Sequence, residues 1–223
     1  MNSKLFISAI SKFLLGVILV GLLVFLPAGT LNYINGIIFM CLLFIPMFIV
    51  GIILMVKNRE LLKRRLKAKE KETTQSIVIK LSGLMFLVGF ILAGLDYRYK
   101  WTYLPLPVSI VFGVIFILAY IMYGEVLREN TYLSRTIEVS EDQKVVDTGL
   151  YGVVRHPMYS SAILLFLSMP LLLGSLISFI IFLIFPFLMI IRIKNEEEVL
   201  TKELKGYEEY KKKVKYKLIP FIY

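Results

Sequence analysis

Apolar residues occur in long blocks along the chain, separated by short polar segments. The blocks lie at residues 6–28, 31–56, 77–95, 108–125, 158–173 and 175–191. A helix needs about 20 mostly apolar residues to cross about 30 Å of hydrocarbon. The pattern therefore predicts an all-α fold, a polytopic membrane helix bundle of about six spans.

The last two blocks are separated only by Gly174 and Ser175, which predicts a helical hairpin. The fifth block, 158–173, is shorter than a usual span. It could be tilted, partly re-entrant, or extended by residues of the preceding loop.

Composition and charge agree with a membrane location. Hydrophobic residues make up 58% of the chain and its mean hydropathy is +0.77. With a cytoplasmic N-terminus, all of the 26 lysines and arginines except Arg98 and Lys100 fall on one side, as the positive-inside rule requires. We therefore expect both termini and the functional site to be cytoplasmic. The expected partners are membrane lipids and no nucleic acid, while the oligomeric state stays open.

The N-terminal part allows more than one interpretation. The first block could be a signal peptide, but its apolar stretch exceeds the usual length of about 7–15 residues, so we expect a retained helix. The basic segment 57–72 fits either a helix lying against anionic headgroups or a solvated loop. We divide the chain into residues 1–76, a transmembrane hairpin with this basic segment, and residues 77–223, a transmembrane core with a cytoplasmic loop and tail.

Several function classes lack their motifs in this sequence. It contains no Gly-rich phosphate loop, no nucleophile-elbow serine and no paired Cys or His at ligand spacing, which argues against nucleotide-driven pumps and metal hydrolases. No metal site is expected, and the single cysteine, Cys41, is expected to pack within its apolar block. Charges approach the spans only near their ends, at Lys12 and Lys80. Transporters usually carry buried charges, so that class is disfavoured.

The only histidine lies in "GLYGVVRHPMY", residues 149–159. Proline fits the first turn of a helix and holds the preceding residue extended. We therefore expect His156 just outside a helix that Pro157 begins, with Tyr159 roughly above it. Such a helix start suits an anionic group of a ligand. The alternative is that Arg155 and His156 only anchor the helix at the headgroups.

A second polar segment, "RIKNEEEVL" at residues 192–200, follows the last block. Arg192 and Glu196 are four residues apart and share one helical face. An arginine that precedes a glutamate stabilises a helix less than the reverse order does. This order favours a ligand-related role, but a solvated face is the alternative. Loop 126–157 and tail 192–223 are predicted on the same membrane face, so they can meet.

In combination, these motifs resemble those of the membrane-embedded methyltransferases, which include isoprenylcysteine carboxyl methyltransferase and phospholipid methyltransferases. The resemblance covers about residues 96–220, through "DYRYKW", "VVDTGLYGVVRHPMY", "RIKNEEEVL", "GYEEY" and "LIP". It implies an S-adenosylmethionine-dependent methyltransferase that acts on a lipophilic small-molecule or lipidated substrate. It also implies that the cytoplasmic loop and a C-terminal helix form the cofactor pocket.

The resemblance further implies which residues form the site. The expected cofactor contacts are Val145, Val146, Tyr151, His156, Pro157, Met158, Tyr159 and Glu196. Arg192 is expected to face the acceptor, which makes Arg192, Glu196 and His156 the expected catalytic residues; Gln143 and Lys144 are only possible contributors. A carboxylate acceptor, as in isoprenylcysteine, could pair with Arg192 and needs no base. A lipid amine must lose a proton, for which His156, Glu196 or Glu197 are candidates.

Two other functions stay open. The "RHPMY" and "YKLIPFIY" segments also resemble membrane reductases of the sterol reductase type, which bind NADPH, although "RIKNEEEVL" and the smaller number of spans fit the methyltransferases better. A non-catalytic membrane scaffold would explain the charges and spans. It would leave the spacing of His156, Arg192 and Glu196 unexplained.

Overall fold

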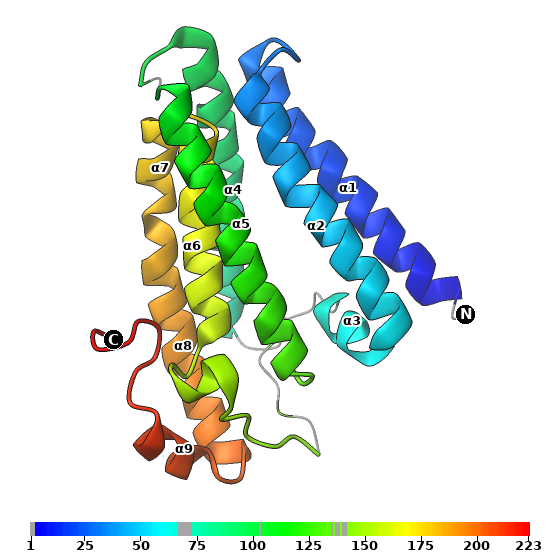
Figure 1. The fold of residues 1–223 in the computed structure, drawn as a ribbon, viewed down its shortest axis with the longest axis vertical. Coiled ribbons are helices and arrows are strands. Elements are labelled where there is room, and N and C mark those ends of the chain that lie inside the picture. Colours follow the sequence, from blue (N-terminus) through cyan, green and yellow to red (C-terminus); the bar gives the residue numbers. More distant parts are fainter. Residues whose placement is uncertain (1–2, 67–72, 103, 135, 137–138, 140–141) are drawn as a thin grey trace.

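The computed structural model describes residues 3–66, 73–102, 104–134, 136, 139 and 142–223, and these residues form helices and connecting loops without a strand (Figure 1). The elements are α1 (Ser3–Ala28), α2 (Ile34–Lys57), α3 (Arg59–Leu66), α4 (Thr73–Tyr99), α5 (Leu106–Glu129), the short 3-10 helix η1 (Gly149–Gly152), α6 (Pro157–Leu172), α7 (Leu176–Phe182), α8 (Ile184–Glu203) and α9 (Tyr207–Lys213). The predicted all-α bundle is confirmed.

Five helical segments among the described residues are long and apolar enough to cross a membrane. They are α1, α2, α4, α5 and the run Leu176–Glu203, in which α8 continues α7 after Leu183. The sixth, α6, has 16 residues, so the short fifth block of the sequence is a short helix. Large apolar side chains such as Leu22, Val56 and Phe187 are exposed on the outside, which suits a surface that lipid solvates. The protein is a multi-pass membrane protein.

The predicted hairpin between the last two spans is present, and its turn is fastened to the end of α4. Gly174 has φ +83°, a left-handed conformation that glycine adopts without strain. Ser175 then caps α7 by accepting a hydrogen bond from the Ser178 N–H. Its hydroxyl also donates to the buried carboxylate of Asp96, which accepts the Thr102 N–H at 2.7 Å. The α6–α7 turn and the α4 end therefore lie at the same level.

Aromatic side chains form much of the core between α4, α6, α7 and α8. Phe182 has no exposed surface and packs against Phe86 and Phe90. Gly89 allows this close approach, because a Cβ at that position would lie 2.3 Å from the Phe182 ring. The ring of Phe166 on α6 packs against those of Phe86 on α4 and Phe185 on α8, so α6 and α8, the two helices that carry the site, are held in a fixed relation.

Helices α1 and α2 lean away from the other spans at the end that carries α3 (Figure 1). Part of the basic segment, residues 59–66, is helix α3, while residues 67–72 lie outside the described residues. Leu61 and Leu62 of α3 are buried, so this part is a packed helix rather than a solvated loop. Cys41 is exposed on α2, which contradicts the expected packing role. The proposed division at residue 76 stays a prediction.

Candidate functional site

The site begins at the junction of loop and α6. Pro157 is the first residue of α6, and His156 is its N-cap residue with φ −126° and ψ 59°, as the sequence predicts. The His156 ring lies over Tyr159, with ring centroids 5.8 Å apart and planes inclined by 30°. His156 is 5% exposed, so its ring is enclosed by protein and does not extend toward the headgroups.

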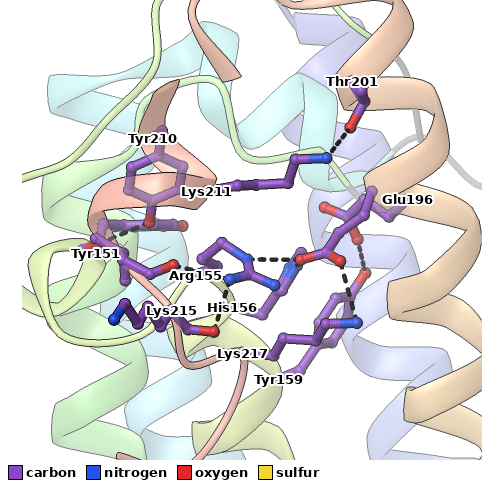
Figure 2. Close-up of polar contacts among 12 residues, drawn as sticks. Tyr151, Arg155, His156, Tyr159, Glu196, Thr201, Tyr210, Lys211, Lys215 and Lys217 are labelled. Carbon is purple, nitrogen blue, oxygen red and sulfur yellow. Dashed lines mark hydrogen bonds and ion pairs between the residues drawn. The ribbon is translucent and has the colours of Figure 1, made fainter. Parts of the chain in front are cut away.

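The C-terminal tail binds directly to this junction. The backbone N–H groups of Arg155 and His156 donate to the carbonyls of Tyr216 and Lys217, each at 2.9 Å. The Arg155 guanidinium also donates to the carbonyls of Val214 and Lys215, each at 2.8 Å (Figure 2). Loop and tail therefore meet, as predicted from their common membrane face.

Glu197 contacts three nitrogen-bearing side chains here, two of them cationic. Its Oε1 accepts from Arg155 Nε at 2.7 Å and lies 3.2 Å from His156 Nε2, while its Oε2 lies 3.1 Å from Lys217 Nζ. These partners come from the loop, the start of α6 and the tail. Glu197 thus fixes the orientation of the imidazole and the position of the tail.

The neighbouring Glu196 has a different partner. Tyr159 OH donates to Glu196 Oε2, and Arg192 Nε donates to Tyr159 OH at 2.9 Å. Arg192 and Glu196 do share a face of α8, with the Tyr159 hydroxyl between them. Arg192 is 8% exposed, so its charge is held inside the protein by a short polar chain that ends in a carboxylate.

These residues surround a cavity of about 800 Å³, called the polar cavity here. Every residue expected at the site lines it except Pro157, whose role is to begin α6. The lining comprises Asn130, Tyr132, Leu133, Ser134, Thr136, Gln143, Lys144, Val145, Val146, Tyr151, Arg155, His156, Met158, Tyr159, Arg192, Glu196, Leu200, Leu204, Tyr207 and Tyr210. Gln143 and Lys144, left out of the expected site, are among them.

Three tyrosines lie on the tail side of the polar cavity, and only Tyr151 was predicted from the sequence. Tyr210 OH donates to the Tyr151 carbonyl at 2.7 Å, and Asn130 Nδ2 donates to Tyr151 OH at 3.0 Å. Tyr207 OH is buried and has no hydrogen-bond partner among the described residues. Burial raises the pKa of all three hydroxyls, so each stays protonated at neutral pH. The aromatic spacing in "GYEEY" was the available signal for Tyr207 and Tyr210.

A close contact shapes the loop before His156. Gly149 has φ +51°, and a Cβ there would lie 1.5 Å from Glu129 Oε1. The Glu129 carboxylate also accepts the Leu150 N–H at 3.1 Å. A side chain at this position would displace the Glu129 carboxylate and strain the backbone. The Glu129–Leu150 hydrogen bond holds η1, with Tyr151, against the end of α5.

A second hollow, of about 1370 Å³, opens between α2, α4, α5, α6 and α8, and is called the apolar cavity here. Its lining is mostly apolar and comprises Leu43, Met47, Arg65, Val78, Ile79, Ser82, Gly83, Phe86, Tyr120, Tyr123, Ser134, Met158, Tyr159, Ala162, Leu165, Phe166, Phe185, Met189 and Arg192. Four residues line both cavities: Ser134, Met158, Tyr159 and Arg192. We call these four the neck, because the two cavities adjoin there.

Comparison with known proteins gives two findings. Residues 107–207 match the family model described as phospholipid methyltransferase, a stretch that runs from α5 to the first residue of α9. The chain is also 27% identical over 134 residues to the Delta(14)-sterol reductase of Mus musculus, covering 54% of this chain and 32% of that protein. The chain thus spans about a third of the length of this curated relative.

Proposed function

We propose that the chain, whose residues 107–207 match the phospholipid methyltransferase family model, transfers a methyl group from S-adenosylmethionine to a lipophilic acceptor within the membrane. One observation carries the proposal: a polar cavity and an apolar cavity meet at Met158, Tyr159 and Arg192. A water-soluble donor and a lipid-soluble acceptor can reach this neck from opposite sides.

The residues of the polar cavity fit S-adenosylmethionine. The cofactor carries a carboxylate, an ammonium group, ribose hydroxyls and an adenine ring. The unpartnered Tyr207 hydroxyl can donate to an acceptor atom of the cofactor, and Glu196 can accept from the ammonium group or a ribose hydroxyl. We assign to the cofactor Val145, Val146, Tyr151, His156, Pro157, Met158, Tyr159 and Glu196, and add Tyr207.

Positioning is the main task of the protein in such a reaction. When bound, S-adenosylmethionine supplies an electrophilic methyl group on a sulfonium ion. Holding two reactants in line can lower the barrier by about 7–11 kcal/mol. Tyr159 lies at the neck with its ring against His156, and its aromatic face can stabilise a nearby cation.

Arg192 is the residue that we assign to the acceptor. It lines both cavities, and Tyr159 holds its Nε. An isoprenylcysteine-like carboxylate could pair with this guanidinium and would need no base. A lipid amine would need His156 or Glu196 as a base, because the Glu197 carboxylate is already paired with the cations of Arg155 and Lys217.

We propose that the site and both termini face the cytoplasm. The charge distribution supports this orientation, since only Arg98 and Lys100 of the 26 cationic residues would lie on the other side. The aromatic residues beside them, including Tyr99 stacked on Trp101 with ring centroids 5.4 Å apart, suit the opposite headgroup layer.

Two measurements test the proposed function. Membranes containing the protein are incubated with methyl-labelled S-adenosylmethionine, and the lipid extract is examined for a labelled product. Separately, S-adenosylhomocysteine should raise the melting temperature of the purified protein, and His156→Ala and Glu196→Ala should weaken this binding in a folded protein. Wild-type affinity in both variants would refute the site.

The match to a mouse sterol reductase favours one alternative, an NADPH-dependent membrane reductase. Stabilisation by NADPH and not by S-adenosylhomocysteine would support it. Stabilisation by neither ligand would favour a non-catalytic scaffold.

A further inference from the structure

After α9 the chain turns back toward the membrane-spanning helices and forms a short turn at residues 219–222 (Figure 1). We call this segment the apolar turn, because its large side chains are apolar and face outward: Ile219 is 51% exposed, Phe221 86% and Ile222 76%. Apolar residues scattered singly over a surface are normal, whereas a contiguous group of them indicates a contact surface.

The apolar turn lies beside the first turn of α6. Ser160 Oγ donates to the Leu218 carbonyl at 2.6 Å, and the Leu218 side chain is buried in the main core. Leu164 lies one helical turn beyond Ser160 on the same face of α6, and its side chain is exposed on the outside of the bundle. The apolar turn therefore continues the lipid-facing surface of α6.

The short α6 places this contact at the membrane boundary. A helix of 16 residues is shorter than the about 20 residues that cross the hydrocarbon layer. The turn after its other end is fastened to Asp96 of α4, beside aromatic residues that suit a headgroup layer. We therefore expect the start of α6, and the tail bonded to it, at or below the opposite headgroup layer, where apolar side chains reach lipid.

Most backbone donors around the apolar turn are bonded within the tail itself. The N–H groups of residues 217–219 donate to the Tyr223 carbonyl at 2.9, 2.7 and 2.9 Å. The N–H groups of Ile222 and Tyr223 donate to the Ile219 carbonyl at 3.2 and 3.1 Å, and the proline of the turn has no N–H group. Lipid chains offer no hydrogen-bond partner, so backbone that faces them must pair its polar groups internally. The apolar turn meets this condition.

Phe221 has a strained backbone that presents its ring to the outside. Its φ of +66° is uncommon for a bulky residue, and such strain persists only where the surrounding structure imposes it. The ring touches Tyr216 on one side, with centroids 5.4 Å apart, and is otherwise exposed. Transfer of this ring from water into lipid would offset the cost of the strain.

Lysines precede the apolar turn. Residues 211–213 are lysines in the last turn of α9, and Lys215 is exposed. Basic residues next to exposed apolar and aromatic side chains are typical of segments that lie in an anionic membrane interface.

The residues just before the apolar turn hold the candidate site together. The carbonyls of Tyr216 and Lys217 accept the N–H groups of Arg155 and His156, and Lys217 Nζ contacts Glu197. The position of the apolar turn therefore bears directly on the His156 junction.

We propose that the apolar turn is a membrane anchor. Ile219, Phe221 and Ile222 insert among the lipid chains of the nearer leaflet, and this insertion holds the preceding tail residues against the junction at His156. The partner is the lipid bilayer itself. The inference concerns the assembly of the site and holds whatever reaction the site catalyses.

The first test measures depth with a single tryptophan. Trp101, the only tryptophan of the chain, is replaced by phenylalanine, and Phe221→Trp, Phe187→Trp or Glu209→Trp is added. Each protein is reconstituted into vesicles of phosphatidylcholine and phosphatidylglycerol with brominated acyl chains, which quench tryptophan on contact. Phe187 is the lipid-facing reference on α8, and Glu209, exposed on α9, is the reference in water.

We expect bromine to quench Phe221→Trp nearly as strongly as Phe187→Trp, with emission at shorter wavelength than that of Glu209→Trp. Quenching and emission like those of Glu209→Trp would overturn the anchor. Emission at short wavelength without quenching, increasing with protein density, would also overturn it, because a second copy of the chain would then cover the turn.

The second test measures hydrogen exchange of the Arg155 and His156 amides in vesicles. Phe221→Gly removes the ring and relieves the backbone strain, since glycine adopts a positive φ freely. Ile222→Ser removes an apolar side chain whose backbone is not strained. Both variants should exchange about tenfold faster or more, because less apolar surface is held in lipid, while Glu209→Ser should exchange like the wild type. Wild-type exchange in both variants would refute the link between the anchor and the site.

Discussion

Glu197 Oε1 lies 3.2 Å from His156 Nε2, whereas Glu196, the preceding residue, bonds to the Tyr159 hydroxyl. Consecutive residues of a helix point about 100° apart, so the two glutamates contact different groups. Glu197 lies on the loop–tail contact, and Glu196 lines the polar cavity. The two carboxylates should therefore differ in what their removal changes.

Removing the Glu197 charge should destabilise the fold. Glu197→Gln leaves the side chains of Arg155, His156 and Lys217 without their shared carboxylate. We expect a loss of about 2–4 kcal/mol in the free energy of unfolding, measured as a lower melting temperature in detergent. Glu196→Gln is the matched control, and it should keep the melting temperature but bind S-adenosylhomocysteine more weakly. A wild-type melting temperature in Glu197→Gln would contradict the structural role assigned to Glu197.

Tyr207 and Tyr210 should respond in opposite ways to loss of the hydroxyl. Tyr207→Phe removes an unpartnered buried hydroxyl, so the ligand-free protein should be as stable as the wild type or about 1 kcal/mol more stable. Its S-adenosylhomocysteine affinity should fall about tenfold. Tyr210→Phe removes the 2.7 Å bond to the Tyr151 carbonyl and should lower ligand-free stability by about 1–2 kcal/mol. Unchanged ligand affinity in Tyr207→Phe would remove Tyr207 from the cofactor site.

Alanine should not be tolerated at Gly149. Its Cβ would overlap Glu129 Oε1, at 1.5 Å, and φ +51° is costly for alanine. We expect Gly149→Ala to lower both the melting temperature and the S-adenosylhomocysteine affinity. A Cβ on Gly124 in α5 would meet no neighbouring group within 4 Å, and Gly124→Ala should be neutral or slightly stabilising. Equal behaviour of the two variants would refute the close-contact argument.

The membrane orientation can be tested with single cysteines. In a Cys41→Ser background, cysteine at Lys213 should react with a membrane-impermeant maleimide only from the cytoplasmic side. Cysteine at Lys100 should react only from the other side, because it lies beside the aromatic residues at the end of α4. The reverse labelling pattern would place the site on the outer face.

Much of the fold could be predicted because the membrane restricts it. The length of each apolar block predicts a membrane-spanning helix, and the break at Gly174 and Ser175 predicts the helical hairpin. Pro157 marks the start of α6 for a local steric reason. Helix α3 was harder to predict from the sequence, because its stability depends on the packing of Leu61 and Leu62 against the bundle. That contact is not encoded in the local charge pattern.

The site could be predicted only in part. His156, Tyr159, Arg192 and Glu196 carry recognisable chemistry at regular spacing. The role of Glu197 could not be predicted, because its partners on the loop and the tail lie far from it in sequence. Arg65 looked like one of many basic residues, and only the tertiary structure separates it from the others.

The shortness of α6 has a consequence for the depth of the candidate site in the membrane. Its far end is level with Asp96 and the aromatic residues at the end of α4. Its 16 residues span about 24 Å. Since the hydrocarbon layer is about 30 Å thick, we predict that His156 lies below the level of the opposite headgroup layer. Such a recessed centre would be sensitive to hydrophobic mismatch, and turnover in vesicles should change with the acyl-chain length of the host lipid. Local thinning of the bilayer would then bring the cofactor and the lipophilic acceptor together, and the acceptor would not have to leave the membrane.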